Sequence, residues 1–124
     1  QFDAAALEAQ IADASRGIVD RNRPSFILAW IRRFAAGIPI TISNLEVNEI
    51  AALHLPAECF VEYQLRAQEM RADRFVACAA YGDGGPWYIP TAEAYPQGGY
   101  EVSSAWCSPA VDEVLTEAIY RLLW

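Results

Sequence analysis

The stretch Arg-Phe-Val-Ala-Cys-Ala-Ala-Tyr at residues 74–81 decides the fold class of this chain. It is a continuous apolar run with almost no polar residue in it. Runs of this kind are typical of strands that lie inside an α/β sheet and are covered on both faces. We therefore predict a buried central strand over residues 74–81.

A hairpin is predicted before this strand. Apolar side chains alternate over residues 38–47, with an irregularity near Ser43, and residues 50–55 return as a second strand. Asn48 tolerates the positive φ of a tight turn, so the two strands should be joined there. Pro56 should end the second strand.

The N-terminal part is predicted to form two helices. Apolar residues recur every three or four positions over residues 3–19, as in an amphipathic helix. Residues 21–24, Arg-Asn-Arg-Pro, should interrupt this helix. Ser25 can then cap a second helix that Gly37 and Pro39 end.

Two more helices are predicted further along. Residues 58–71 form one of them. The other begins with Ser108 as its N-cap and Pro109 at its first position. We expect an α/β (α+β) fold over residues 1–124 as a single unit: a small mixed sheet of three to four strands with helices packed on it. Its order is helix, helix, strand, strand, helix, strand, long loop, helix.

The composition excludes several classes of protein. The 124 residues are 54% apolar, with 9 basic and 16 acidic residues and a net charge of -7. This composition is globular, and its acidity argues against a nucleic-acid partner. No apolar stretch is long enough to span a membrane. The three cysteines are too few for a disulfide scaffold. Free buried thiols are expected, and the alternative is one disulfide with one thiol left over.

The loop between the predicted central strand and the last helix is unusually long, at about 25 residues. It is rich in glycine and in aromatic residues, so its composition is not that of a disordered segment. Such a loop can bind a ligand, for example an apolar one, or it can cover the edge of the sheet. The residues alone leave both interpretations open.

Glu58 is the second candidate for a functional group. It follows a strand and opens a predicted helix, which is the ligand side of an α/β sheet, but it can equally be an acid that interacts with the helix dipole. His54 fits a structural role better than a ligand role. The spacing of His54, Glu58 and Cys59 matches no standard zinc signature.

Two segments carry a more specific pattern. Residues 56–60 read Pro-Ala-Glu-Cys-Phe, and residues 88–95 read Tyr-Ile-Pro-Thr-Ala-Glu-Ala-Tyr, followed after four residues by Tyr100-Glu101. They resemble the Pro-Gly-Glu-Phe segment and the Tyr-(Val/Ile)-x-Thr-x-Glu-Glu-Tyr…Tyr-Glu pattern of the neutral/alkaline (non-lysosomal) ceramidases. The resemblance is to the C-terminal part of the catalytic domain, in the bacterial ceramidase-like branch, from about residue 38 onward.

The resemblance implies a catalytic zinc held by Glu58, Tyr88 and two histidines from far upstream. Tyr100 would stabilise the oxyanion formed when the amide is attacked. Three departures bear on the substrate: Ala57 replaces the glycine before the glutamate, Ala94 replaces an acid, and residues 83–87 differ. Since catalytic zinc usually has three protein ligands, the chain alone should neither bind zinc tightly nor hydrolyse amides.

We therefore expect the C-terminal segment of a zinc-dependent amide hydrolase that cleaves N-acyl-sphingosine or another amide. A start at Gln1 without a signal peptide agrees with a piece of a longer protein. Its partner would be the N-terminal part of the hydrolase, exposed apolar surface would cause self-association, and the relatives' export implies a secreted or periplasmic protein. The alternative is a non-catalytic α/β interaction or ligand-binding module, and the proximity of Glu58, Tyr88 and Tyr100 separates the two.

Overall fold

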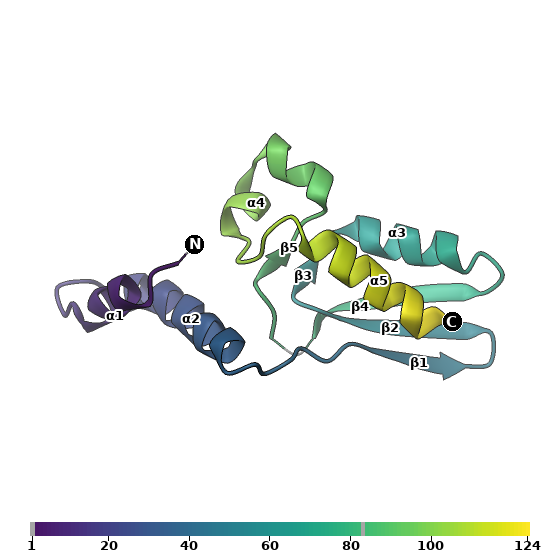
Figure 1. Ribbon diagram of the computed structural model, residues 1–124, viewed down its shortest axis with the longest axis horizontal. Helices are drawn as coiled ribbons and strands as arrows, with labels where there is room; N and C mark the ends of the chain where they lie inside the picture. The colour runs from purple at the N-terminus through teal and green to yellow at the C-terminus, as the bar shows by residue number, and fades with distance from the viewer. Residues whose placement is uncertain (1, 83) are drawn as a thin grey trace. The chain divides into compact units, whose positions relative to one another are not determined.

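The computed structural model describes residues 2–82 and 84–124 of the chain (Figure 1). It confirms a mixed helix-and-strand fold with helices packed on a three-stranded sheet. The chain divides into two compact units, Gln1–Pro39 and Ile40–Trp124. Among the described residues, no helix combines the length and the apolar character needed to cross a membrane.

The first unit consists of two helices, α1 (Ala4–Ala12) and α2 (Ile18–Ala35). The carboxylate of Asp3 caps α1 by accepting from the amides of Ala5 and Ala6. The two helices pack against each other and bury Leu7, Ile27 and Leu28.

The interruption predicted at residues 21–24 is wrong, because α2 runs through Pro24. The chain instead breaks at residues 13–17. There the carboxylate of Asp13 accepts from the amide (3.0 Å) and the hydroxyl (2.6 Å) of Ser15, which is a local turn that competes with helix. Ser25 is not an N-cap either: its hydroxyl donates to the carbonyl oxygen of Arg21, one turn back in the same helix.

The second unit is built on a sheet with strand order β1-β2-β4. Strands β1 (Ser43–Val47) and β2 (Ile50–Pro56) form the predicted antiparallel hairpin, and Asn48 at the turn has a φ of 52°. The strand predicted from residue 38 begins only at Ser43. Strand β2 extends through Pro56 rather than ending before it.

Strand β4 (Phe75–Gly82) pairs with β2 in parallel. The central strand is therefore β2, and the prediction that residues 74–81 form the central strand is wrong. An apolar run shows that a strand is covered, but it does not show on how many edges the strand is paired.

Helices α3 (Val61–Met70) and α5 (Val111–Leu123) lie on the same face of the sheet (Figure 1). They bury alternate residues of the strands in one core, which includes Leu53, Leu55, Val76, Leu115 and Ile119. The predicted starts of both helices are wrong: Glu58 precedes α3 in an extended segment, and residue Ala110 rather than Ser108 is the N-cap of α5.

Side chains of α3 also cover the outer edge of β4. The amide group of Gln68 donates to the carbonyl oxygen of Val76 at 3.1 Å, and the side-chain oxygen of Gln64 accepts from the amide of Cys78 at 3.3 Å. Backbone groups on an edge strand otherwise invite pairing with another chain. Helix α3 therefore protects this edge.

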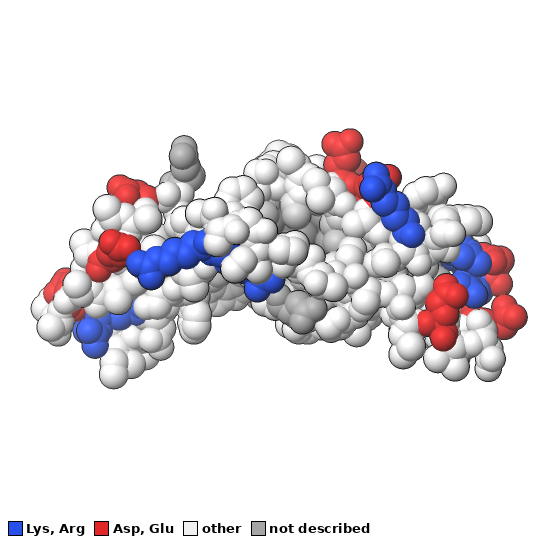
Figure 2. Space-filling model, turned by 60° about the horizontal axis from the view of Figure 1, so that its bottom comes forward, with Lys and Arg blue, Asp and Glu red and all other residues white. Residues whose placement is uncertain are grey.

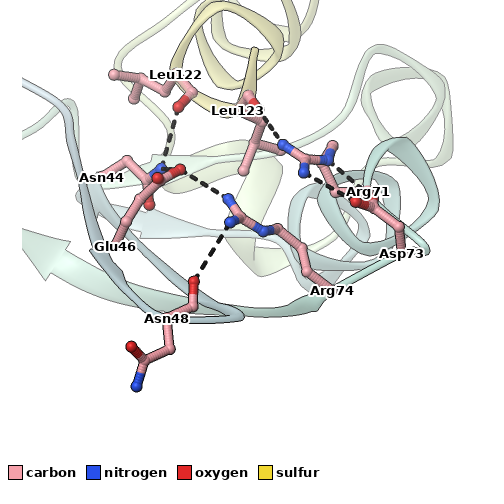
Figure 3. Close-up of polar contacts among 8 residues, drawn as sticks. All are labelled: Asn44, Glu46, Asn48, Arg71, Asp73, Arg74, Leu122 and Leu123. Atoms are coloured by element: carbon pink, nitrogen blue, oxygen red, sulfur yellow. Dashed lines mark hydrogen bonds and ion pairs between the residues drawn. The ribbon is translucent and has the colours of Figure 1, made fainter.

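The end of α5 is fastened to the rest of the sheet by side chains (Figure 3). Arg71 donates to the carbonyl oxygen of Leu123, and Asn44 donates to that of Leu122 at 3.1 Å. These bonds satisfy carbonyl groups that a helix end leaves without an intrahelical partner. Nearby, Arg74 binds the carboxylate of Glu46 at 2.8 Å, so the hairpin and the α3–β4 connection are held together.

The long loop predicted between the sheet and the last helix contains regular structure. It holds β5 (Tyr88–Ile89), a 3-10 helix η1 (Ala92–Gln97) and α4 (Tyr100–Ser104). Strand β5 pairs in parallel with β3 (Glu58–Cys59) and makes a second, two-stranded sheet. This small sheet brings together the two segments whose sequence pattern suggested a site.

Candidate functional site

Glu58 and Tyr88 are paired residues of neighbouring strands. Strand β3 lies parallel to β5 in a register that sets Glu58 opposite Tyr88. The amide of Glu58 donates to the carbonyl oxygen of Trp87 at 2.8 Å, and the amide of Phe60 donates to that of Ile89 at 3.1 Å. Paired residues in a parallel ladder lie on the same face, and neighbouring strands are about 4.8 Å apart. The side chains of Glu58 and Tyr88 therefore lie side by side on one face of the small sheet.

Tyr100 joins this pair from another element. It is the first residue of α4, and its ring lies 5.8 Å from the ring of Tyr88, at an interplanar angle of 77°. Gly98 and Gly99, with φ of 73° and 101°, turn the chain just before it. Since other residues rarely adopt such φ values, these glycines allow the turn that presents Tyr100 to Tyr88.

The surroundings of Tyr88 disfavour its anion. Its pKa is raised, first because the hydroxyl is partly removed from water, and then because of the charge of Glu58 and a hydrogen bond with it. Tyr100 and Glu101 add smaller contributions in the same direction. Two carboxyl groups and one further phenol hydroxyl therefore influence the titration of Tyr88.

The backbone next to this cluster takes a conformation that is uncommon outside glycine. Among the described residues other than glycine, four have a positive φ: Asn48 in the hairpin turn, and Ala57 (57°), Tyr81 (66°) and Trp87 (68°). Ala57 directly precedes Glu58, and Trp87 directly precedes Tyr88. Residues held in such conformations cluster at functional sites, where surrounding contacts enforce them.

Hydrogen bonds and close packing enforce these conformations. The amide of Tyr81 donates to the carbonyl oxygen of Ala57 at 2.7 Å, and the amide of Ala57 donates to that of Gly82 at 3.3 Å. A side chain at Gly85 would place its Cβ 2.3 Å from the Cβ of Ala57, so the loop needs glycine there. The backbone that leads into Glu58 is thus held by both β4 and the loop.

Side chains from the core fix the segment that carries Tyr88. The hydroxyl of Tyr63, whose side chain is fully buried, donates to the carbonyl oxygen of Pro90 at 3.1 Å. The hydroxyl of Tyr95 donates to the carbonyl oxygen of Cys107 at 2.9 Å, and the thiol of Cys107 donates to that of Tyr88 at 3.4 Å. The loop is therefore tied to the core on both sides of the small sheet.

Asp112 is a structural residue of the site that the sequence did not reveal. It is buried, accepts from the amide of Ala92 at 2.7 Å, and forms an ion pair with Arg66. Burial alone would raise the pKa of Asp112, but the hydrogen bonds from Arg66 and Ala92 outweigh it and lower the pKa. Asp112 is in the first turn of α5, where an acid is common, and local sequence does not reveal its partners because they lie 46 and 20 residues away along the chain.

The other sequence-based candidates lie apart from a shared metal site. His54 points away from the core face of β2, toward the backbone of Gly82. The thiol of Cys59 donates to the carbonyl oxygen of Pro56 at 2.9 Å, and burial raises its pKa to about 12. All three cysteines are free, as expected. Within residues 2–82 and 84–124, no three His, Cys, Asp or Glu side chains are grouped closely enough to hold a metal ion.

Two tryptophans of the aromatic loop pack against each other. The rings of Trp87 and Trp106 meet edge to face, with centroids 4.8 Å apart, and the amide of Trp106 donates to the carbonyl oxygen of Pro86 at 2.9 Å. This packing explains how so long a loop keeps a fixed path. It agrees with a covering role for the two tryptophans.

Glu58 and Tyr88 fit a zinc ion as half of a ligand set. Carboxylate and phenolate oxygens are acceptable zinc ligands, and both come from one pair of strands. A catalytic zinc needs three protein ligands and an open position. Further ligands would therefore have to come from outside the described residues.

No family model matches this chain, and neither does any curated protein or solved structure. The geometry around Glu58, Tyr88 and Tyr100 is therefore the basis for assigning a function.

Proposed function

We propose that this chain is the C-terminal segment of a zinc-dependent amide hydrolase resembling the neutral ceramidases. Glu58 and Tyr88 are two of its zinc ligands, and Tyr100 stabilises the oxyanion. One observation supports this above all: two segments thirty residues apart pair so that Glu58 lies opposite Tyr88, and Tyr100 stacks edge-on against Tyr88.

The conformation of Ala57 gives independent support. The ceramidase pattern has glycine at this position, and Ala57 has a φ of 57°, which glycine adopts without strain. A chain that keeps this conformation with alanine accepts roughly 1 kcal/mol of strain. The replacement therefore preserves the geometry of the glutamate that follows.

The chain's own residues have distinct roles in this proposal. Zinc, when bound, polarises the amide carbonyl and acidifies a bound water. Glu58 supplies negative charge and orients Tyr88, whose raised pKa keeps it protonated until a cation is present. Tyr100 is 63% exposed, so its hydroxyl is free to donate to the oxygen of a substrate amide as negative charge develops there.

Two histidines from outside this chain complete the site, in the N-terminal part of the hydrolase. The isolated chain is then inactive. The substrate is an amide, with N-acyl-sphingosine as the first one to test. Residues 84–87 form a glycine-rich turn that leads into β5 and could shape substrate access, while Asp83 lies outside the described residues.

A zinc titration of the isolated chain tests the ligand roles. Because two ligands are present, we expect weak binding, with a dissociation constant on the order of 1 mM, that tightens when imidazole supplies missing donors. In amide NMR spectra, the signals of Glu58 and Tyr88 should shift together. The Glu58→Gln and Tyr88→Phe variants should lose these shifts, whereas Tyr120→Phe, on the exposed side of α5, should keep them.

Zinc-induced shifts that are confined to His54 or the cysteines would contradict the proposed ligands. A second arm uses the longest natural protein that contains this segment. There, Tyr100→Phe should lower kcat/KM for amide hydrolysis by about 100-fold, the effect of removing one oxyanion donor. Full activity of that variant would remove Tyr100 from the mechanism.

A non-catalytic interaction module is the second candidate, and one observation favours it. The face of the three-stranded sheet that α3 and α5 leave uncovered presents large apolar side chains, among them Leu45, Phe75 and Tyr81. An uncovered apolar surface of this kind commonly marks an interaction site.

A further inference from the structure

Tyr100 is carried by a loop whose two ends are fixed to the second unit. The hydroxyl of Tyr95, before it, donates to the carbonyl oxygen of Cys107, after it, at 2.9 Å, so the two sides of the loop are joined at its base. The amide of Trp106 donates to the carbonyl oxygen of Pro86 at 2.9 Å and fixes the same end to the neighbouring turn. A loop that leaves and rejoins the fold at neighbouring points is an Ω-loop, a kind that is frequently functional.

The outer part of this loop, residues 98–105, is held largely by bonds within itself, and we call it the α4 segment. The amide of Ser103 donates to the carbonyl oxygen of Gly99 at 3.1 Å, and its hydroxyl donates to that of Tyr100 at 2.7 Å. The structure describes all of residues 98–105, and among them Ser104 alone is buried. A segment with internal bonds and little burial opens locally at a lower free energy than the core does.

A pair of glycines joins the α4 segment to the 3-10 helix before it. Gly98 has φ 73° and ψ -148°, and Gly99 has φ 101° and ψ 177°, which are conformations that essentially only glycine adopts. A Cβ at Gly98 would meet no atom within 4 Å, so there is free space around this joint. Residues of this kind can absorb the change in φ and ψ that a hinge requires.

The ring of Tyr100 connects the α4 segment to the candidate site. In Figure 1, α4 lies beside β5, and the rings of Tyr100 and Tyr88 meet nearly edge to face, with centroids 5.8 Å apart. An aromatic pair of this geometry contributes about 0.5–1.5 kcal/mol. Helix α4 itself has five residues, too few to be stable without such support. This ring contact is therefore strong enough to favour the closed position, and weak enough to break while the core stays folded.

We propose that the α4 segment is a lid over Glu58 and Tyr88. It opens by rotation about Gly98 and Gly99, which separates the ring of Tyr100 from that of Tyr88. When the lid is open, a ligand has access to Glu58 and Tyr88; when it closes, the hydroxyl of Tyr100 returns to the site. The motion does not depend on the proposed hydrolase function, whereas its use to admit a substrate amide rests on that proposal.

Native-state amide hydrogen exchange of the full chain, followed by NMR, tests the motion. The amide of Ser103 is bonded inside the lid, whereas that of Trp106 is bonded at its fixed end. We expect Ser103 to exchange at least about tenfold faster than Trp106, because it needs only the local opening. Tyr100→Ala removes the ring contact and should speed exchange at Ser103 by roughly two- to tenfold, with Trp106 unchanged. Tyr100→Phe keeps the ring and should keep the wild-type rate.

Tyr120→Ala is the matched control, because it removes a ring contact on α5, with Trp124 at 6.3 Å. It should leave exchange at Ser103 unchanged. Equal exchange rates at Ser103 and Trp106 in the wild-type chain would overturn the lid. So would a Tyr100→Ala variant with the wild-type rate at Ser103, or a Tyr120→Ala variant that speeds this exchange as much as Tyr100→Ala does.

The use of the lid in catalysis is tested in the longest natural protein that contains this segment. Gly98→Ala adds a methyl group that meets no neighbour but strains the hinge at its positive φ, so kcat and KM should change together. Unchanged kcat and KM would show that the lid does not admit substrate. If the natural protein hydrolyses no amide at all, the hydrolase proposal fails, and the exchange rates at Ser103 still decide whether the lid moves.

Discussion

Ala57 holds the backbone that orients Glu58. Its φ of 57° is in the left-handed region, its carbonyl oxygen accepts from Tyr81, and its methyl group packs against Gly85. A left-handed conformation costs an alanine about 1 kcal/mol relative to glycine. A β-branched side chain is penalised more heavily, because its two branches clash with the backbone.

Within extended segments, glycine usually destabilises a fold more than valine does. At Ala57 this order should be reversed. Ala57→Gly should change the free energy of unfolding by less than about 1 kcal/mol, since relief of strain offsets the lost methyl burial. Ala57→Val should destabilise by more than about 2 kcal/mol. Urea unfolding measures both, and Ala79→Val, at an exposed strand position, is the control that should be neutral.

The pKa of Tyr88 reports its contact with Glu58. The charge of Glu58 disfavours the phenolate, so Glu58→Gln should lower the pKa of Tyr88 toward the ordinary value for tyrosine. Ring-carbon NMR titration of the metal-free protein measures this value directly. Glu113→Gln, on the surface of α5, should leave it unchanged; an equal pKa in Glu58→Gln and the wild type would mean that the two side chains do not interact.

At the scale of elements, Asp112 connects three segments: α3 through Arg66, the start of η1 through Ala92, and α5 itself. Its folded-state pKa is lowered, so it contributes stability above the pKa of the unfolded chain. This stability is lost as the pH falls through the folded-state pKa. The second unit should therefore weaken in acid partly through Asp112.

Asp112→Asn should destabilise the second unit by about 2 kcal/mol at pH 7, because Arg66 and the amide of Ala92 lose a charged acceptor. The loss should shrink as the pH is lowered below about 4, where the wild-type carboxyl becomes protonated too. Urea unfolding at pH 7 and pH 3 measures the difference. Glu113→Gln, at the neighbouring exposed position, should show neither effect, and an equal loss at both pH values for Asp112→Asn would refute the linkage.

Helices and strands that are long enough to show a regular apolar pattern could be predicted from the sequence. Elements of only two residues could not. The hairpin, β4, and the helices α3 and α5 follow from apolar spacing and from Asn48. Strands β3 and β5 have two residues each, and only their pairing across thirty positions defines them. The break between α1 and α2 was misplaced because proline is a strong sequence signal, whereas the turn at Asp13 depends on a side-chain hydrogen bond.

For the site, sequence resemblance suggested Glu58, Tyr88 and Tyr100, and the fold brings these three together. It could not reveal Asp112 or Tyr63, because nothing in local sequence shows that a polar group is buried and bonded to a distant backbone. The zinc-binding roles of Glu58 and Tyr88 and the catalytic role of Tyr100 stay predictions.

At the scale of the whole molecule, the larger buried cluster lies within one of the two units. Its buried cluster runs from Ala51 to Leu123, all within Ile40–Trp124. We expect a chain that begins at Ile40 to fold cooperatively by itself. Its urea transition should be single, and its amide NMR signals for β2, β4 and α5 should match those of the full chain; loss of dispersed signals would show that residues 1–39 are needed for folding.

The central claim is that Glu58 and Tyr88 hold zinc beside Tyr100. Anomalous diffraction from crystals of the chain grown with zinc and imidazole tests it most directly. The account predicts a zinc ion with one oxygen of Glu58 and the hydroxyl oxygen of Tyr88 at about 2.0–2.2 Å, and imidazole completing the coordination. Zinc bound only at His54 or at a cysteine, with Glu58 and Tyr88 pointing to opposite sides, would contradict it.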